Sequence, residues 1–275
     1  MTPRNPSDPW VLRLQPRQAA RLRLFCFPYA GGGVASFAQW PRQLPAQIEV
    51  YALQAPGREN RLREPPLRRM GPLAERAAAA IEPYADLPFA LFGHSLGALV
   101  AFEVACRLRA AGRPLPLHLY VSGRQAPHLA DSRPPMYVLP EDSFLAELQR
   151  RYGGTRLMLL DDREMRRLLL PALRADVEVI ETYRYVDQPP LDCSLSAFRG
   201  SEDACTREGV SAWRMHVTGA FQEWTFPGGH FYLETCRQAF LECLAGGLSE
   251  LLARTGPTLP AGASASCGGS ARNRR

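Results

Sequence analysis

Lysine is absent from this sequence. All 33 basic residues are arginine, and with 27 acidic residues they give a formal net charge of +6. Because alanine, glycine and proline are also abundant, we attribute the absence mainly to a GC-rich coding sequence. The arginines are spread along the chain without a helix-turn-helix, zinc-finger or RNA-binding signature, so no nucleic-acid partner is expected. The positive surplus is compatible with an acidic partner.

Long apolar runs are missing as well. None approaches the roughly 20 residues that span a bilayer, and residues 1–8 contain no apolar signal core. The sequence therefore predicts no membrane segment and no secretion signal. The seven cysteines form no C-x-x-C pair and show no zinc-ligand spacing with histidine, so no metal site is expected. We expect Cys26 and Cys106 to be buried apolar residues in a cytoplasmic protein.

The chain length and composition suit one large α/β domain or two small ones. The chain has 275 residues, of which 46% are hydrophobic and 22% are charged, as is typical of soluble globular proteins. We predict a single domain over residues 1–254, acting as a monomer. Residues 255–275 are rich in Gly, Ala, Ser and Pro with a basic end, and are predicted to form a disordered tail.

Strand-like and helix-like segments alternate along most of the chain. Helix-like segments, such as 73–84 and 96–108, separate most of the strand-like ones. This alternation predicts an α/β fold with a largely parallel sheet covered on both faces. The predicted strands are residues 10–14, 22–27, 48–53, 89–92, 117–121, 194–198 and 220–226.

Residues 135–185 depart from this alternation. They contain amphipathic helical patterns around Phe144 and Leu173, interrupted at Gly153-Gly154, and no strand-like run. We predict that they form a helical lid over the sheet, because they precede the strand that should carry a catalytic acid. The alternative is that they are ordinary covering helices.

Residues 93–97, Gly-His-Ser-Leu-Gly, match the nucleophile-elbow pattern G-x-S-x-G. A strand-like run precedes them and a helix-like run follows, which is the context that this pattern requires. The elbow holds a serine on a sharp turn beside a base, where its hydroxyl can act as a nucleophile. The sequence therefore predicts Ser95 as the catalytic nucleophile.

The base is predicted to be His230, which follows the last strand and the turn Pro227-Gly228-Gly229. In elbow hydrolases the triad residues follow the order Ser, Asp or Glu, then His. The other histidines fit less well. His94 should be turned away by the elbow, His118 lies in a strand, His128 precedes the lid, and His216 lies in a helix-like stretch.

The acid that orients this base should follow the preceding strand, 194–198. Asp203 is predicted for the role, because a carboxylate there can hold the imidazole in the required tautomer. Glu202 is the nearest alternative. Asp187 and Asp192 precede the strand and rank lower.

An oxyanion hole needs two backbone N–H donors. One is predicted at Leu96, after the nucleophile, where a helix begins. The other is predicted at Tyr29, with Ala30 as the alternative, in the Gly-rich loop 27–33 after an early strand. This loop could also be a plain turn. Phosphate binding is less favoured, because the chain has no G-x-x-x-x-G-K-[ST] motif.

Taken together, these residues resemble the type II thioesterases that accompany polyketide synthases and non-ribosomal peptide synthetases. The resemblance spans about residues 10–250. Tyr29 stands where many relatives carry His, and the segment Gly-Ser-Glu-Asp-Ala at 200–204 replaces the commoner G-D-x-D-P, with Asp203 in register. The matching segments are 27–32 (FPYAGG), 55–58 (APGR), 92–97 (FGHSLG), 120–124 (YVSGR) and 228–232 (GGHFY).

The resemblance implies an α/β-hydrolase fold with a helical lid. It also implies an editing function, in which unwanted acyl groups are hydrolysed from the phosphopantetheine arm of acyl or peptidyl carrier proteins. The expected partners are those carrier proteins, and no cofactor is expected. The arginines at positions 58, 61, 63, 68 and 69 form either a docking site for an acidic carrier protein or a solvated basic loop.

Three other functional classes remain open from the residues alone. An oxygen-ester esterase or lipase would use the same triad. An acyltransferase would replace water with an alcohol or amine. A hydrolase-like scaffold could bind a ligand without catalysis, although the intact set Ser95, Asp203 and His230 argues against this.

Overall fold

The protein is built around one seven-stranded sheet. The computed structural model describes residues 9–129, 131, 133–153 and 162–255. Within these residues the strand order is β1-β3-β2-β4-β5-β6-β7; β1 runs antiparallel to β3, and all other neighbouring strands are parallel. The strands are β1 Val11–Arg13, β2 Leu22–Phe27, β3 Ile48–Leu53, β4 Phe89–His94, β5 His118–Ser122, β6 Ser194–Gly200 and β7 Phe221–Phe226.

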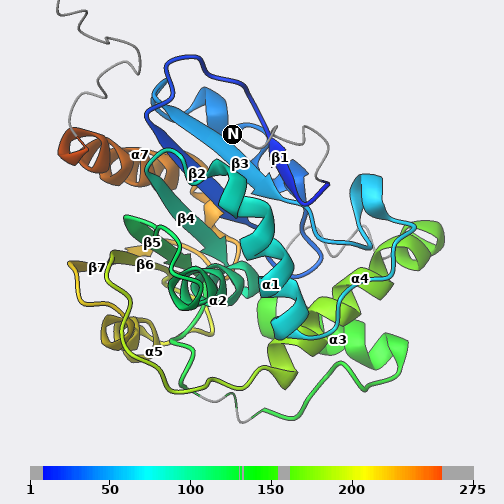
Figure 1. Ribbon diagram of the computed structural model, residues 1–275. Coiled ribbons are helices and arrows are strands. Elements are labelled where there is room, and N and C mark those ends of the chain that lie inside the picture. The colour runs from blue at the N-terminus through cyan, green and yellow to red at the C-terminus, as the bar shows by residue number, and fades with distance from the viewer. Residues whose placement is uncertain (1–8, 130, 132, 154–161, 256–275) are drawn as a thin grey trace, which may run out of the picture.

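Helices cover both faces of this sheet (Figure 1). Alternate residues of a strand point to opposite faces. Phe25 and Phe27 of β2 pack into the core under α1 and α2, whereas Leu24 and Cys26 pack into the core under α7. The helices are α1 Met70–Ile81, α2 Leu96–Ala110, α3 Glu141–Tyr152, α4 Arg163–Thr182, α5 Arg207–Ser211, α6 Tyr232–Thr235 and α7 Arg237–Arg254. The predicted α/β fold with a parallel sheet is confirmed.

The α-helical part of the predicted helix 73–84 ends earlier than expected. Helix α1 ends at Ile81 and continues as a 3₁₀ turn over Glu82–Tyr84. Pro83 explains the change, since it has no N–H to donate to the helix and its ring clashes with the preceding turn. The chain then enters β4.

The predicted lid region contains α3 and α4, which stand between β5 and β6 in the chain (Figure 1). The two helices share a small core of their own, in which Phe144 and Leu148 of α3 meet Leu173 and Val177 of α4. Gly153 ends α3 in the left-handed region, at φ +60°. Helix formation on either side of the predicted interruption is thus confirmed, while residues 154–161 lie outside the described part.

Two expectations about the chain ends stay predictions. The tail proposed for 255–275 lies, apart from Thr255, outside the described residues, and so does the N-terminal segment 1–8. Within the described part of the chain, no helix combines the length and the apolar character needed to span a bilayer. Cys26 and Cys106 are buried, as expected.

Candidate active site

The nucleophile elbow is present at the junction of β4 and α2. Ser95 has φ 56° and ψ −114°, a strained conformation for a residue with a side chain. Its N–H donates to the Ser122 carbonyl oxygen at the end of β5, at 2.8 Å. A Cβ at Gly93 would lie 2.1 Å from the carbonyl oxygen of Gly97. Gly93 is therefore needed for the strand and helix to close around Ser95.

The start of α2 lies directly against the Gly-rich loop that follows β2. A Cβ at Gly97 would lie 2.0 Å from the carbonyl oxygen of Phe27. The first N–H groups of a helix have no partners within it, so the Leu96 N–H is available at this contact. Tyr29 follows Phe27 by two residues. The fold thus brings the two predicted oxyanion-hole segments into contact.

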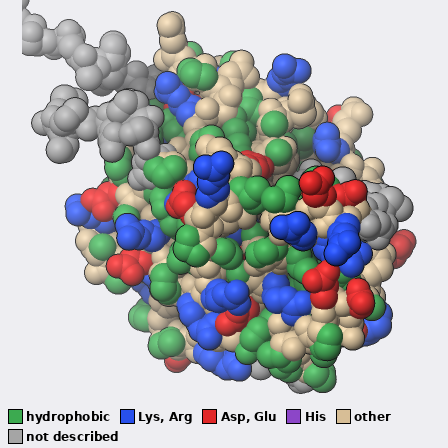
Figure 2. Space-filling view, turned by 90° about the vertical axis from the view of Figure 1, so that its right-hand side faces the viewer, with side chains coloured by type: hydrophobic (Ala, Val, Ile, Leu, Met, Phe, Trp, Pro, Cys, Tyr) green, Lys and Arg blue, Asp and Glu red, His purple; other side chains and the backbone are tan. Residues whose placement is uncertain are grey.

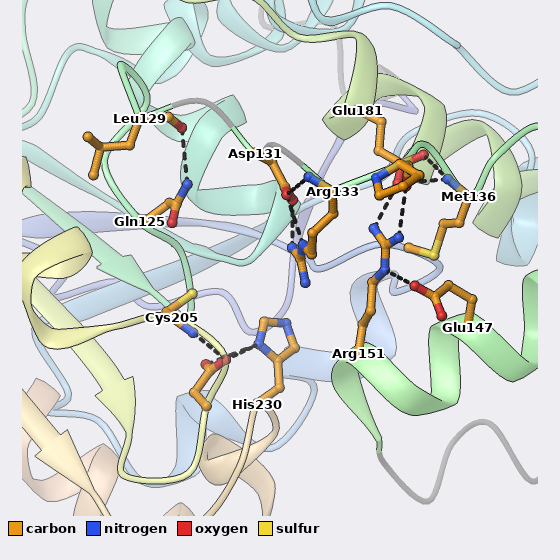
Figure 3. Close-up of polar contacts among 12 residues, drawn as sticks. Gln125, Leu129, Asp131, Arg133, Met136, Glu147, Arg151, Glu181, Cys205 and His230 are labelled. Atoms are coloured by element: carbon orange, nitrogen blue, oxygen red, sulfur yellow. Dashed lines mark hydrogen bonds and ion pairs between the residues drawn. The ribbon is translucent and has the colours of Figure 1, made fainter.

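His230 and Asp203 form a buried hydrogen-bonded pair. Nδ1 of His230 lies 3.1 Å from both carboxylate oxygens of Asp203, whose side chain is 1% exposed. Burial acts to raise the pKa of this carboxyl, but the hydrogen bond and charge of His230 and the Cys205 N–H outweigh it and lower the pKa. An ionised carboxylate only accepts, so Nδ1 carries the proton and Nε2 can act as a base. In Figure 3, the dashed lines from the Cys205 N–H and from the His230 ring lead to the Asp203 carboxylate, which is drawn without a label.

Glycines again allow this pair to form. β6 and β7 are neighbours, and the loops that follow them touch: the Glu202 N–H donates to the Gly228 carbonyl oxygen at 2.9 Å. A Cβ at Gly200 would lie 2.3 Å from the carbonyl oxygen of Gly229. The absence of a side chain there lets the two loops approach and bring Asp203 to His230.

The alternative acids and bases lie elsewhere. Glu202, Asp187 and Asp192 occupy exposed positions. His118 bonds to Ser196 Oγ within the sheet, and His128 pairs with His216 at 2.7 Å. Among the described residues, no group of three or more His, Cys, Asp or Glu side chains could hold a metal ion.

His94 has a role that sequence reasoning missed. Its Nδ1 shares a hydrogen bond with Ser122 Oγ at 2.8 Å, and that hydroxyl lies 2.5 Å from the Tyr232 hydroxyl. Its ring packs against His230, with the centroids 4.9 Å apart. Burial and the nearby His230 lower the pKa of His94 well below its ordinary value. A neutral imidazole thus packs against the His230 ring. No local sequence pattern predicts this contact.

Ser95 and His230 line the same cavity, which has a volume of about 440 Å³. This volume falls within the roughly 300–1,000 Å³ of small-molecule sites. Much of its wall is apolar and comes from the lid helices, with Leu148 from α3 and Leu169 and Leu173 from α4 among the lining residues. The cavity therefore suits an apolar group attached to a reactive carbonyl.

The lid reaches the base through Tyr152 at the end of α3. Its ring centroid lies 4.9 Å from that of His230. The neighbouring Arg151 bonds to Glu147, Glu181 and the Pro134 carbonyl oxygen, and so connects α3, α4 and the segment before them (Figure 3). Tyr152 is thus held over His230 by a cross-linked lid.

Two of the five arginines expected in a docking site or a solvated basic loop are buried instead. Arg58 and Arg61 are 6% and 7% exposed, because Arg58 pairs with Asp176 and Arg61 donates to the Gln54 carbonyl oxygen. Arg63, Arg68 and Arg69 are exposed, and the last two pair with Glu178, so for these three both the docking site and the solvated loop stay open. The face that includes α3 and α4 mixes basic and acidic side chains rather than presenting one sign (Figure 2).

Comparison with known proteins shows the family of this chain. Residues 22–246 match the family model of the thioesterase domain. The chain is 40% identical to the gramicidin S biosynthesis protein GrsT of Aneurinibacillus migulanus, over 89% of this chain and 95% of that protein.

Solved structures of thioesterases have the same fold. The RedJ thioesterase from the prodiginine pathway of Streptomyces coelicolor superposes with a TM-score of 0.78 at 42% identity, covering 84% of this chain and 88% of RedJ. YbtT, a type II thioesterase from the yersiniabactin NRPS/PKS pathway, gives 0.75 at 32% identity, covering 86% and 96%. This chain therefore belongs to the thioesterase family of serine thioester hydrolases with the α/β-hydrolase fold, and its relatives include type II thioesterases of polyketide and non-ribosomal peptide pathways.

Proposed function

We propose that this protein is a discrete editing thioesterase. It removes aberrant or short acyl groups from the phosphopantetheine arm of acyl or peptidyl carrier proteins. The observation that carries the proposal is one cavity lined by both the elbow serine Ser95 and His230, which is itself paired with the buried carboxylate of Asp203. The relatives named for gramicidin S, prodiginine and yersiniabactin biosynthesis support the carrier-bound substrate.

In the first half of the reaction, Ser95 becomes acylated. Nε2 of His230 takes the proton from Ser95 Oγ as that oxygen attacks the thioester carbonyl carbon. The N–H groups of Leu96 and Tyr29 stabilise the resulting oxyanion. The C–S bond then breaks, the sulfur leaves with the proton that His230 returns, and the acyl group remains on Ser95.

In the second half, water releases the acid. His230 takes a proton from a water molecule, the hydroxide attacks the acyl-enzyme carbonyl, and Ser95 Oγ leaves with the proton from His230. Asp203 keeps His230 in the required tautomer throughout and stabilises its cationic form. Every proton and electron pair comes from the enzyme, the thioester or water, so this mechanism requires no cofactor.

The cavity accounts for an acyl group as the bound part of the substrate. Its apolar walls, which include Leu169 and Leu173, exclude water from an alkyl chain. Both residues belong to α4, so the lid helps to set which acyl groups fit. The pantetheine arm leaves the cavity toward the carrier protein, which stays outside.

The test is a panel of carrier proteins loaded with different acyl groups and analysed by intact mass spectrometry. We expect loss of the acyl mass from the carrier, and a decrease of up to about 10⁶-fold in rate for Ser95→Ala. Matched oxygen esters should react more slowly than the thioesters. Near-normal hydrolysis by the Ser95→Ala variant, or faster cleavage of oxygen esters, would end the proposal.

A further inference from the structure

A buried ion pair connects the lid to the loop after β3. Arg58 Nη1 and Nη2 bond to Asp176 Oδ2 and Oδ1, both at 2.8 Å. Asp176 belongs to α4, and the two residues are 6% and 2% exposed. The bidentate geometry fixes both the distance and the orientation of the two groups. We call Arg58 and Asp176 the anchor pair.

The anchor pair also bonds to the backbone of the Gly-rich loop, at one N–H group and one carbonyl group. The Gly31 N–H donates to Asp176 Oδ2 at 2.8 Å, and Arg58 Nη1 donates to the Gly32 carbonyl oxygen at 3.0 Å. These groups belong to a tight turn in which the Gly32 N–H donates to the Tyr29 carbonyl oxygen at 2.8 Å. Gly31 has φ +74°, which such a turn accepts at little cost only from glycine. The turn contains both candidate oxyanion donors after β2.

A second carboxylate holds the first residues of the 3₁₀ helix Val34–Phe37, directly after the loop. Glu59 accepts from the N–H groups of Val34 and Ala35 at 3.2 and 3.0 Å, and its own φ is +48°. A Cβ at Gly33 would lie 2.3 Å from Glu59 Oε1. Charged side chains therefore hold this loop at Gly31 and Gly32 and the backbone directly after it.

Stability alone does not account for such a pair. A buried ion pair contributes little net stability, because removing two charges from water offsets their attraction, and apolar residues often replace such pairs without loss. Backbone N–H and C=O groups, in contrast, need polar partners to hold them in one place. A displacement of about 1 Å at a reacting centre can slow an enzyme about 100-fold. The contacts of the anchor pair to Gly31 and Gly32 therefore fit a function in holding the loop backbone in one position.

We propose that Asp176 and Arg58 are positioning residues for the oxyanion hole. Through Gly31 and Gly32 they hold the turn that carries the Tyr29 and Ala30 N–H groups, so oxyanion stabilisation depends on α4 being seated on the loop. The inference rests on the proposed function, since it assigns the turn to the thioester oxyanion.

The first test replaces Asp176 with Asn. The amide has one acceptor oxygen for three donors, the Gly31 N–H and the two Arg58 nitrogens, so the turn loses its fixed position. With an acyl N-acetylcysteamine thioester, which needs no carrier protein, we expect kcat to fall about 100-fold and KM to change less than threefold. The control is Glu178→Gln, two residues along α4, because Glu178 is also a buried carboxylate but pairs with the exposed Arg68 and Arg69 rather than with the Gly-rich loop. Its kcat should stay within twofold.

The second test separates position from stability. The double variant Arg58→Met/Asp176→Leu replaces the pair with apolar side chains and should regain the Tm that Asp176→Asn loses. It still lacks partners for Gly31 and Gly32, so kcat should stay low. Recovery of kcat together with Tm would show a merely structural role and overturn the inference, as would an unchanged kcat in Asp176→Asn.

These outcomes are distinct from failure of the proposed function. That failure would appear as wild-type hydrolysis that does not depend on Ser95. If hydrolysis requires Ser95 and yet tolerates Asp176→Asn, the inference alone is lost.

Discussion

Gly97→Ala is the change that most directly tests how the elbow meets the oxyanion loop. The new Cβ would lie 2.0 Å from the Phe27 carbonyl oxygen and 2.8 Å from that of Pro28, whereas ordinary contact begins at 3.4 Å. The start of α2 and the loop after β2 would have to separate by about 1.4 Å. Both are backbone segments, so no side chain can turn aside to make room.

The expected effect on catalysis exceeds the effect on stability. Loss of one oxyanion donor costs about 10²–10³ in kcat, and a displacement of about 1 Å has a similar cost. Overpacking destabilises a fold by about 1–3 kcal/mol, which a domain of ordinary stability tolerates. We therefore expect Gly97→Ala to be folded, with a lowered Tm and kcat reduced 10²–10³-fold.

The assay is steady-state hydrolysis of a small thioester, with thermal unfolding followed by circular dichroism. Gly246→Ala is the matched control: Gly246 lies within α7, and a Cβ there would meet nothing within 4 Å. This control should keep its kcat and gain slightly in Tm, since alanine favours a helix. A Gly97→Ala enzyme with kcat within threefold of the wild type would refute the reasoning.

Two further changes address the acid and the cavity. Asp203→Asn should lower kcat about 10⁴-fold, and a loss of less than tenfold would contradict its pairing with His230. Because the pKa of Asp203 is lowered in the fold, its ionised form stabilises the protein above about pH 3.9, the unfolded value, and this contribution is lost as the pH falls through the folded pKa. Thermal unfolding from pH 3 to 8 should show the Tm gap between wild type and Asp203→Asn closing below about pH 4. Leu169→Trp should reduce kcat/KM for an octanoyl thioester about tenfold more than for an acetyl thioester, and an equal reduction would place the acyl chain elsewhere.

The strands could be predicted well from the sequence because they belong to a parallel sheet. Such strands are buried on both faces and form continuous apolar runs, as Leu22–Phe27 and Ile48–Leu53 do. All seven lie within two residues of their predicted positions. The elbow and the base could be predicted in the same local way, because Gly93 and Gly97 flank Ser95 and Gly228-Gly229 directly precede His230.

Residues that act through distant partners could not be predicted in the same way. Arg58 was expected in a docking site or a solvated basic loop, and neither expectation foresaw its partner Asp176, which lies 118 residues further along the chain. One signal was available, since Asp176 falls on the apolar stripe of α4 beside Leu173, Val177 and Ile180. A carboxylate on such a stripe requires a buried partner. His94 offered no comparable signal, because its environment depends on loops from β5 and β7.

Cys205 places a second nucleophile two residues from the acid, in an enzyme whose substrates are thioesters. A thiolate is a far stronger nucleophile toward thioesters than a thiol is. Burial and the negative charge of Asp203 raise the pKa of the Cys205 thiol to about 12. At neutral pH the sulfur therefore remains protonated and poorly nucleophilic, and burial and the carboxylate that orients His230 act together to keep it so.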